Sequence, residues 1–172
     1  IGCDPLEIVF TSGGSESNNL AIKGVFDGLA NRRMLFSSAE HPSVRRTAEV
    51  LAERGASVEF IPVPRSGLID MAAYARMLEG TGFVSVMYAN IETGNVFPIR
   101  EMAALARGKG AIFHSDCVQV LGKIPLNVAE LGVDLASFSG HKFYALKGAG
   151  ALYVRRGTRL ESLIHGGGQG RH

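Results

Sequence analysis

The chain has 172 residues, of which 46% are hydrophobic and 20% charged, and its formal net charge is +2. This balance is typical of one globular domain and excludes a disordered or fibrous chain. Its apolar runs all fall short of the roughly 20 residues that span a bilayer, and its basic residues are scattered, so we expect neither a membrane nor a nucleic-acid partner.

Seven short apolar strand candidates alternate with helical patterns along the chain. We predict strands at residues 7–11, 34–38, 57–63, 83–88, 111–115, 133–139 and 150–154, and helices at about 15–29, 42–54, 71–78 and 98–109. Apolar strands that alternate with helices indicate a mostly parallel sheet with helices on both faces. The last two strands are joined without a helix and could form an antiparallel addition at one edge. The predicted fold class is α/β, a three-layer α/β/α domain.

Ligands of such sheets bind at the carboxyl ends of the strands, and the first polar stretch there is FTSGGSESNN. Gly14 permits close approach of a ligand, the helix start offers unpaired N–H groups, and Ser15 could cap the helix or add its hydroxyl. We expect a phosphate here, with a simple tight turn as the alternative. A dinucleotide site with Glu40 as the ribose-binding acid also stays open, although the glycine spacing does not match that motif.

Two later stretches carry groups suited to pyridoxal phosphate (PLP). Asp116 ends a strand and could pair with a pyridine nitrogen, while Gln119 could reach a ring substituent. Lys142 directly follows another strand, where burial would make its amine nucleophilic, and Ser139 and His141 could hold a phosphate. Taken singly, the aspartate could be a helix cap and the lysine could reach solvent. Together with the glycine loop they match the requirements of PLP.

Two more strand ends add candidates. His41 follows the second strand and could stack on a flat cofactor while acting as an acid–base group, or it could simply lie at a helix start. Asn90 and Glu92 follow the fourth strand. The two cysteines, Cys3 and Cys117, lack metal-ligand spacing, so no metal site is expected, and they suit a reducing, cytoplasmic setting.

The sequence resembles the cysteine desulfurases of the NifS/IscS type, within the class V aminotransferase superfamily. The resemblance rests on EIVFTSGGSESNNLAIKGV, FVSVMYANIETG, HSDCVQVLGKIPL, VDLASFSGHKFYALKGAGALYVRR and HGGGQ, in this order. It implies the large domain of PLP fold-type I, a homodimer, L-cysteine as substrate and a sulfur-acceptor or scaffold protein as partner.

The resemblance also implies roles for single residues. Lys142 would hold the cofactor's aldehyde and transfer protons, and His41 would stack on the ring. Asp116 would face the pyridine nitrogen and Gln119 the phenolic oxygen. The phosphate would be held by Gly14, Ser15, Ser139 and His141.

The sequence departs from the family pattern in three places. Ile91 stands where the family has a second asparagine that contacts the ring oxygen, so we expect weakened cofactor binding. Cys117 is not the family's sulfur-accepting cysteine. We expect residues 1–172 to be a PLP-binding large domain that lacks an N-terminal segment and a C-terminal small domain, and that is inactive alone. Another class V enzyme, such as an aminotransferase or a selenocysteine lyase, and a non-catalytic fragment of the PLP fold stay open.

Overall fold

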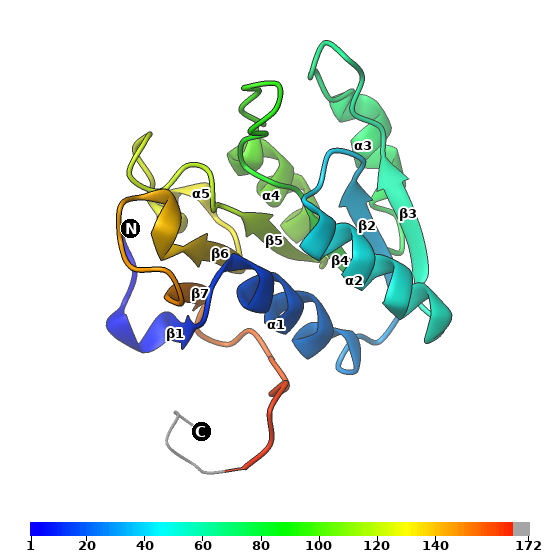
Figure 1. Cartoon of the computed structure of the whole chain (residues 1–172). Coiled ribbons are helices and arrows are strands. Elements are labelled where there is room, and N and C mark those ends of the chain that lie inside the picture. The colour runs from blue at the N-terminus through cyan, green and yellow to red at the C-terminus, as the bar shows by residue number, and fades with distance from the viewer. Residues whose placement is uncertain (167–172) are drawn as a thin grey trace.

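The computed structural model describes residues 1–166 and contains one sheet with strand order β1-β7-β6-β5-β4-β2-β3. Helices cover both of its faces (Figure 1). The strands are β1 (Ile8–Thr11), β2 (Arg33–Ser37), β3 (Ser57–Ile61), β4 (Phe83–Ser85), β5 (Ile112–Asp116), β6 (Leu135–Ser139) and β7 (Gly150–Val154). The helices are α1 (Gly14–Phe26), α2 (Pro42–Glu53), α3 (Met71–Met77), α4 (Ile99–Gly108) and α5 (Val128–Leu131). The predicted three-layer fold with seven strands is confirmed.

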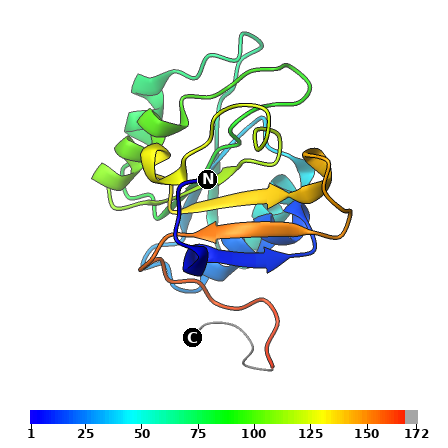
Figure 2. The same ribbon diagram turned by 90° about the vertical axis from the view of Figure 1, so that its left-hand side faces the viewer.

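Strand direction places the chemistry on one side of the sheet. Strands β2 to β6 pair in parallel, whereas β7 is antiparallel to both of its neighbours, β6 and β1. Figure 2 shows β7 pointing opposite to the two strands that flank it. The predicted antiparallel pairing is confirmed, although β1 and not β7 occupies the edge. The carboxyl ends of β1, β2, β4, β5 and β6 therefore face the same side.

Apolar side chains on both faces of the strands hold the layers together. Met34 and Phe36 of β2 pack in one core with α1 and α2, while Leu35 between them belongs to the opposite core with α3 and α4. Successive residues of a strand point to opposite faces, so a strand covered on both sides needs a continuous apolar run. Full burial of each such side chain contributes about 1.5–3 kcal/mol.

The helix ends follow local sequence signals, with one exception. Pro42 is the first residue of α2, and Gly55 and Gly110 lie beyond helix ends with φ of 91° and 75°, conformations that glycine adopts without strain. Ser15 does not cap α1, contrary to prediction. The cap position is Gly13, which has no side chain to offer, so Ser15 falls inside the first turn.

Two predicted elements end earlier than expected. The fourth strand stops at Ser85 because the N–H of Met87 donates to the carboxylate of Glu40, 2.7 Å away, rather than to a neighbouring strand. The third strand stops at Ile61, before Pro62 and Pro64. In the described part of the chain, no helix has the length and apolar character to cross a membrane. The end of the HGGGQ stretch lies outside the described residues.

Candidate active site

The loop after β1 presents a helix start to the cavity. Because Gly13 provides no side-chain cap, the N–H groups of the first turn of α1 lack partners within the helix and are available to an anion. A Cβ on Gly14 would lie 2.7 Å from Cγ2 of Val118, so glycine lets the loop approach the segment that follows β5 this closely. Ser15 is exposed beside these N–H groups.

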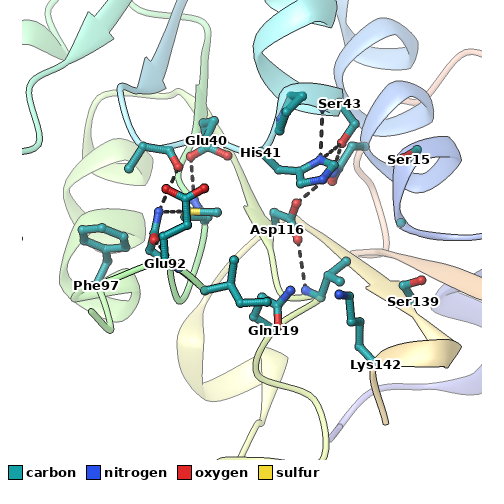
Figure 3. Close-up of a pocket in the computed structure, with 18 of the residues that line it drawn as sticks. Ser15, Glu40, His41, Ser43, Glu92, Phe97, Asp116, Gln119, Ser139 and Lys142 are labelled. Carbon is teal, nitrogen blue, oxygen red and sulfur yellow. Dashed lines mark hydrogen bonds between the residues drawn. The ribbon is translucent and has the colours of Figure 1, made fainter. Parts of the chain in front are cut away.

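The end of β6 brings the lysine to the same side. Gly140–Lys142 forms a 3-10 turn, in which His141 Nδ1 lies 2.9 Å from Ser139 Oγ. Lys142 is half-buried, and within residues 1–166 no carboxylate lies within ion-pair distance of its amine. Figure 3 shows its side chain extending toward Asp116. The amine is therefore available to a ligand.

Asp116 is the buried acid of the site. It ends β5 with 5% of its surface exposed. Its Oδ1 accepts from the N–H of Val118 at 3.0 Å and its Oδ2 from Nδ2 of Asn18 at 2.8 Å. Burial raises the pKa of the Asp116 carboxyl, while these two hydrogen bonds oppose the shift. A cationic nitrogen placed against this carboxylate would favour its charged form.

His41 has a structural role as well as access to the cavity. It occupies the cap position of α2, where its Nδ1 accepts from the N–H of Ser43 at 3.1 Å. The ring is exposed, and in Figure 3 it approaches Asp116 from the side opposite to Lys142. The interpretation as a helix-start residue is thus correct, and it leaves the ring free to contact a ligand.

The side chains of Asn90 and Gln119 already form hydrogen bonds within the protein. The Oδ1 of Asn90 accepts from the N–H groups of Glu92 and Thr93, at 2.9 and 3.0 Å, so it closes the turn after β4. Its Nδ2 donates to the carbonyl of Ala39. Gln119 accepts from Lys123 through Oε1 at 3.0 Å. Asn90 therefore shapes the wall of the cavity rather than presenting an unused amide to it.

Glu40 was considered only as a ribose-binding acid, and the structure gives it a different place. Its Oε1 accepts from Ser37 Oγ and from the N–H of Met87, while its Oε2 is buried without a partner. Burial raises the pKa of Glu40 to about 8, with a smaller contribution from the charge of Asp116. An acid whose carboxyl oxygens are buried or engaged in joining β2 to the loop after β4 is poorly suited to hold a ribose.

All nine predicted site residues line one cavity of about 810 Å³ at the carboxyl ends of the strands. They are Gly14, Ser15, His41, Asn90, Asp116, Gln119, Ser139, His141 and Lys142. Two further lining residues, Asn18 and Ser43, were not predicted, and Glu40, which also lines the cavity, was predicted only as the acid of an alternative dinucleotide site. Asn18 stands one turn after the glycine loop, and this spacing was the available signal. Neither cysteine lines the cavity.

Fold and site together define an α/β domain in which a buried acid, an amine without a carboxylate partner among residues 1–166 and an uncapped helix start surround one cavity. Residues 1–171 match the family model described as Aminotransferase class-V. The chain therefore belongs to the class-V aminotransferase family.

Individual relatives with high similarity to the chain include cysteine desulfurases. The chain is 46% identical to the cysteine desulfurase IscS of Dictyoglomus turgidum over 98% of its length and 44% of that protein. It is 48% identical to a cysteine desulfurase of Gluconacetobacter diazotrophicus, over 96% and 42%. The resemblance to NifS/IscS-type proteins is thus confirmed. The chain spans about 44% of the length of the first of these relatives.

Solved structures agree. A NifS-like protein matches with a TM-score of 0.93 and 37% identity, over 96% of this chain and 47% of its own. A structure described as SspA in complex with cysteine matches with a TM-score of 0.92 and 39% identity, over 97% and 50%.

Proposed function

We propose that this cavity binds pyridoxal phosphate through Lys142. The observation that carries the proposal is the convergence of three groups on one cavity, a free amine, a buried carboxylate and an uncapped helix start. PLP has one matching group for each, an aldehyde, a pyridine nitrogen and a phosphate.

The residues present fit the cofactor. The glycine at position 14 keeps the loop close to β5, and Ser15 and Ser139 supply hydroxyl groups beside the unpaired N–H groups. Asp116 has hydrogen-bond donors on both carboxylate oxygens, which favour the charged form that a pyridinium requires. When bound, PLP would supply the electron sink for chemistry at the carbon next to an amino group.

We further propose that the protein is a cysteine desulfurase. Lys142 would hold and move the proton at the substrate's α-carbon, and His41 would cover the ring face. The C–S bond of L-cysteine breaks, alanine leaves, and the sulfur passes to a thiol as a persulfide. Burial raises the pKa of Cys117 to about 12, so that thiol is unsuited to accept sulfur, and we propose that the acceptor thiol lies elsewhere. The named relatives and the neighbour in complex with cysteine support this substrate.

The proposed assembly is a homodimer that passes sulfur to an acceptor or scaffold protein. Residues 1–172 would form the PLP-binding large domain within it. Large apolar side chains stand exposed on β1 and on the loop that follows Lys142, at Phe10, Tyr144 and Leu146. Apolar surface of this kind is typical of a face that another polypeptide covers.

The decisive experiment is an absorbance titration with PLP. We expect the wild-type protein to develop a near-visible band that survives dialysis and is bleached by borohydride, and Lys142→Ala to lack it. Lys147→Ala is the matched control, because Lys147 is an exposed lysine of the same loop, and it should retain the band. A wild-type protein without the band would overturn the proposal.

A second measurement addresses the substrate. With L-cysteine and a thiol reductant, we expect PLP-loaded residues 1–172 alone to release neither alanine nor sulfide. A PLP-loaded protein in which these residues are joined to the proposed small domain should release alanine and sulfide in equal amounts. A persistent band without alanine in that longer protein would point instead to another reaction of the class V family.

A further inference from the structure

A continuous chain of hydrogen bonds connects His41 to Asp116 through two residues on different helices. His41 Nδ1 lies 2.7 Å from Ser43 Oγ, which lies 2.9 Å from Asn18 Nδ2. The same Nδ2 lies 2.8 Å from Asp116 Oδ2. Asn18 belongs to α1 and is 1% exposed, and Ser43 belongs to α2. Figure 3 shows Ser43, His41 and Asp116 around this path.

The direction of each bond follows from groups that can only donate or only accept. The backbone N–H of Ser43 can only donate, so His41 Nδ1, which it contacts at 3.1 Å, is an acceptor. The Asp116 carboxylate accepts, so the amino side of the Asn18 amide must face it, because the reverse orientation would oppose two oxygens. The second N–H of that amide then points to Ser43 Oγ, and the hydroxyl proton of Ser43 is left for His41 Nδ1.

This polarity sets the tautomer of His41. Two donors, the N–H and the O–H of Ser43, converge on Nδ1, so the proton of the neutral imidazole resides on Nε2. A proton on Nδ1 would face both donors. The ring is thereby fixed in one orientation and one tautomer at the rim of the cavity.

The arrangement is not explained by helix packing alone. The Oδ1 of Asn18 is buried and has no hydrogen-bond partner among residues 1–166, and such a group is unfavourable in a protein interior. On the same two helices, Thr47 Oγ1 donates to Asn19 Oδ1 at 3.1 Å, a contact that joins α1 to α2 without this cost. The Thr47–Asn19 contact therefore already joins α1 to α2. We conclude that the contacts of Asn18 orient the residues at the cavity rather than hold the two helices together.

We propose that Asn18 and Ser43 are positioning residues that hold Asp116 and His41 as one unit, with Asn18 orienting the carboxylate and Ser43 fixing the Nε2–H tautomer of the imidazole. The inference rests on the proposed function only for its consequence. That consequence is that Asp116, which would face the pyridine nitrogen of PLP, and His41, which would cover the ring face, are already oriented before the cofactor binds.

The tautomer can be measured without the cofactor. Two-bond ¹H–¹⁵N NMR of the cofactor-free protein distinguishes the Nδ1–H and Nε2–H forms, and the five histidines are assigned with the help of His41→Gln. We expect a single Nε2–H form for His41 in the wild type and in Ser43→Thr, which keeps the hydroxyl. Ser43→Ala removes the hydroxyl donor and keeps only the longer backbone N–H contact to Nδ1, so it should show a minor population with the proton on Nδ1. An unchanged His41 spectrum in Ser43→Ala would overturn the role of Ser43.

The role of Asn18 is measured by PLP affinity. Asn18→Leu should raise the dissociation constant about tenfold, as expected for loss of a hydrogen bond to a charged group. Thr47→Val is the matched control, since it removes a hydroxyl from the same helix interface without touching His41 or Asp116, and its affinity should equal that of the wild type. Equal affinity in Asn18→Leu, or equal losses in both variants, would overturn the role of Asn18.

The two failures are distinguishable. If the wild type forms no PLP band, the proposed function fails, and the NMR measurement still decides the tautomer. If the wild type binds PLP and the variants at 18 and 43 behave like it in both measurements, only the inference fails.

Discussion

By the resemblance to the NifS/IscS type, Ile91 stands where the family has an asparagine. It lines the cavity, yet 63% of it is exposed. An apolar side chain so exposed contributes little to folding, and it offers no hydrogen bond to a ligand. We therefore expect Ile91 to weaken ligand binding relative to an asparagine at this position.

We expect Ile91→Asn to tighten PLP binding about fivefold to tenfold, because one hydrogen bond is added to the ligand. Folding stability should change by less than about 0.5 kcal/mol, since the side chain is largely exposed. Fluorescence or absorbance titration with PLP measures the first effect and urea unfolding the second. Ile91→Ala is the control, and equal affinities in the Asn and Ala variants would show that the amide makes no contact.

The site residues that could be predicted from the sequence differ in kind from those that could not. Asp116, His41 and Lys142 were predicted because each stands at a strand end, where ligand-binding residues gather. Asn18, Ser43 and Glu40 act by contacts to residues distant in the sequence, such as Asn18 with Asp116. The spacing of residues along one helix or strand does not indicate which residue of another element they contact. These contacts could therefore be identified only from the three-dimensional structure.

At the scale of the elements, strand placement was predictable and strand length was not. The apolar runs located all seven strands, but β4 ends where the Glu40 carboxylate takes the N–H of Met87. Helix α5 was missed because its four residues are too few to show a period. The cap expected at Ser15 was wrong because the helix begins one residue earlier, at Gly14.

One element contact yields a sharp prediction. Gly150 begins β7 between Thr11 of β1 and Ser139 of β6, and a Cβ there would lie 2.5 Å from the Cα of Gly13. The obstacle is backbone, so the glycine loop itself must shift. We expect Gly150→Ala to lower PLP affinity at least about tenfold and stability by about 1–3 kcal/mol, as for overpacking of a rigid site.

The matched control for Gly150→Ala is Gly108→Ala. Gly108 lies in α4, and a Cβ there meets nothing within 4 Å. Alanine is the better helix former by about 1 kcal/mol, so this variant should be at least as stable as the wild type and bind PLP equally. PLP titration and thermal unfolding of both variants test the pair. A Gly150→Ala protein with wild-type affinity would show that the loop tolerates the displacement.

At the scale of the whole molecule, the buried ionisable groups set how stability depends on pH. His114 lies in the centre of the sheet with its ring nitrogens 2.8 Å from Ser85 Oγ and 2.9 Å from Ser137 Oγ, on β4 and β6. Burial lowers the pKa of His114 to about 3. Below its ordinary value of 6.5 the unfolded chain binds a proton that the folded chain does not, so stability falls as pH falls from 6.5 toward 3.

Glu40 acts in the opposite sense. Because burial raises the pKa of Glu40 from 4.5 to about 8, the folded chain retains a proton that the unfolded chain has released. Its stabilising effect is full below pH 4.5 and is lost as pH rises to 8. Burial also raises the pKa of Asp116, which adds to the same trend. Between pH 4.5 and 6.5 the contributions of His114 and Glu40 therefore oppose one another.

We predict that the cofactor-free protein loses stability from pH 6.5 to 8, with a slope of up to about 1.4 kcal/mol per pH unit from Glu40. Glu40→Gln keeps an acceptor for Ser37 and Met87 and cannot ionise, so its curve should rise to pH 6.5 and then be flatter than that of the wild type. Urea unfolding at half-unit steps from pH 4 to 8 measures both curves. Parallel curves for the two proteins above pH 6.5 would mean that Glu40 is already ionised in the fold. The loops after β2 and β4 would then be joined by hydrogen bonds to a buried carboxylate rather than to a neutral carboxyl group.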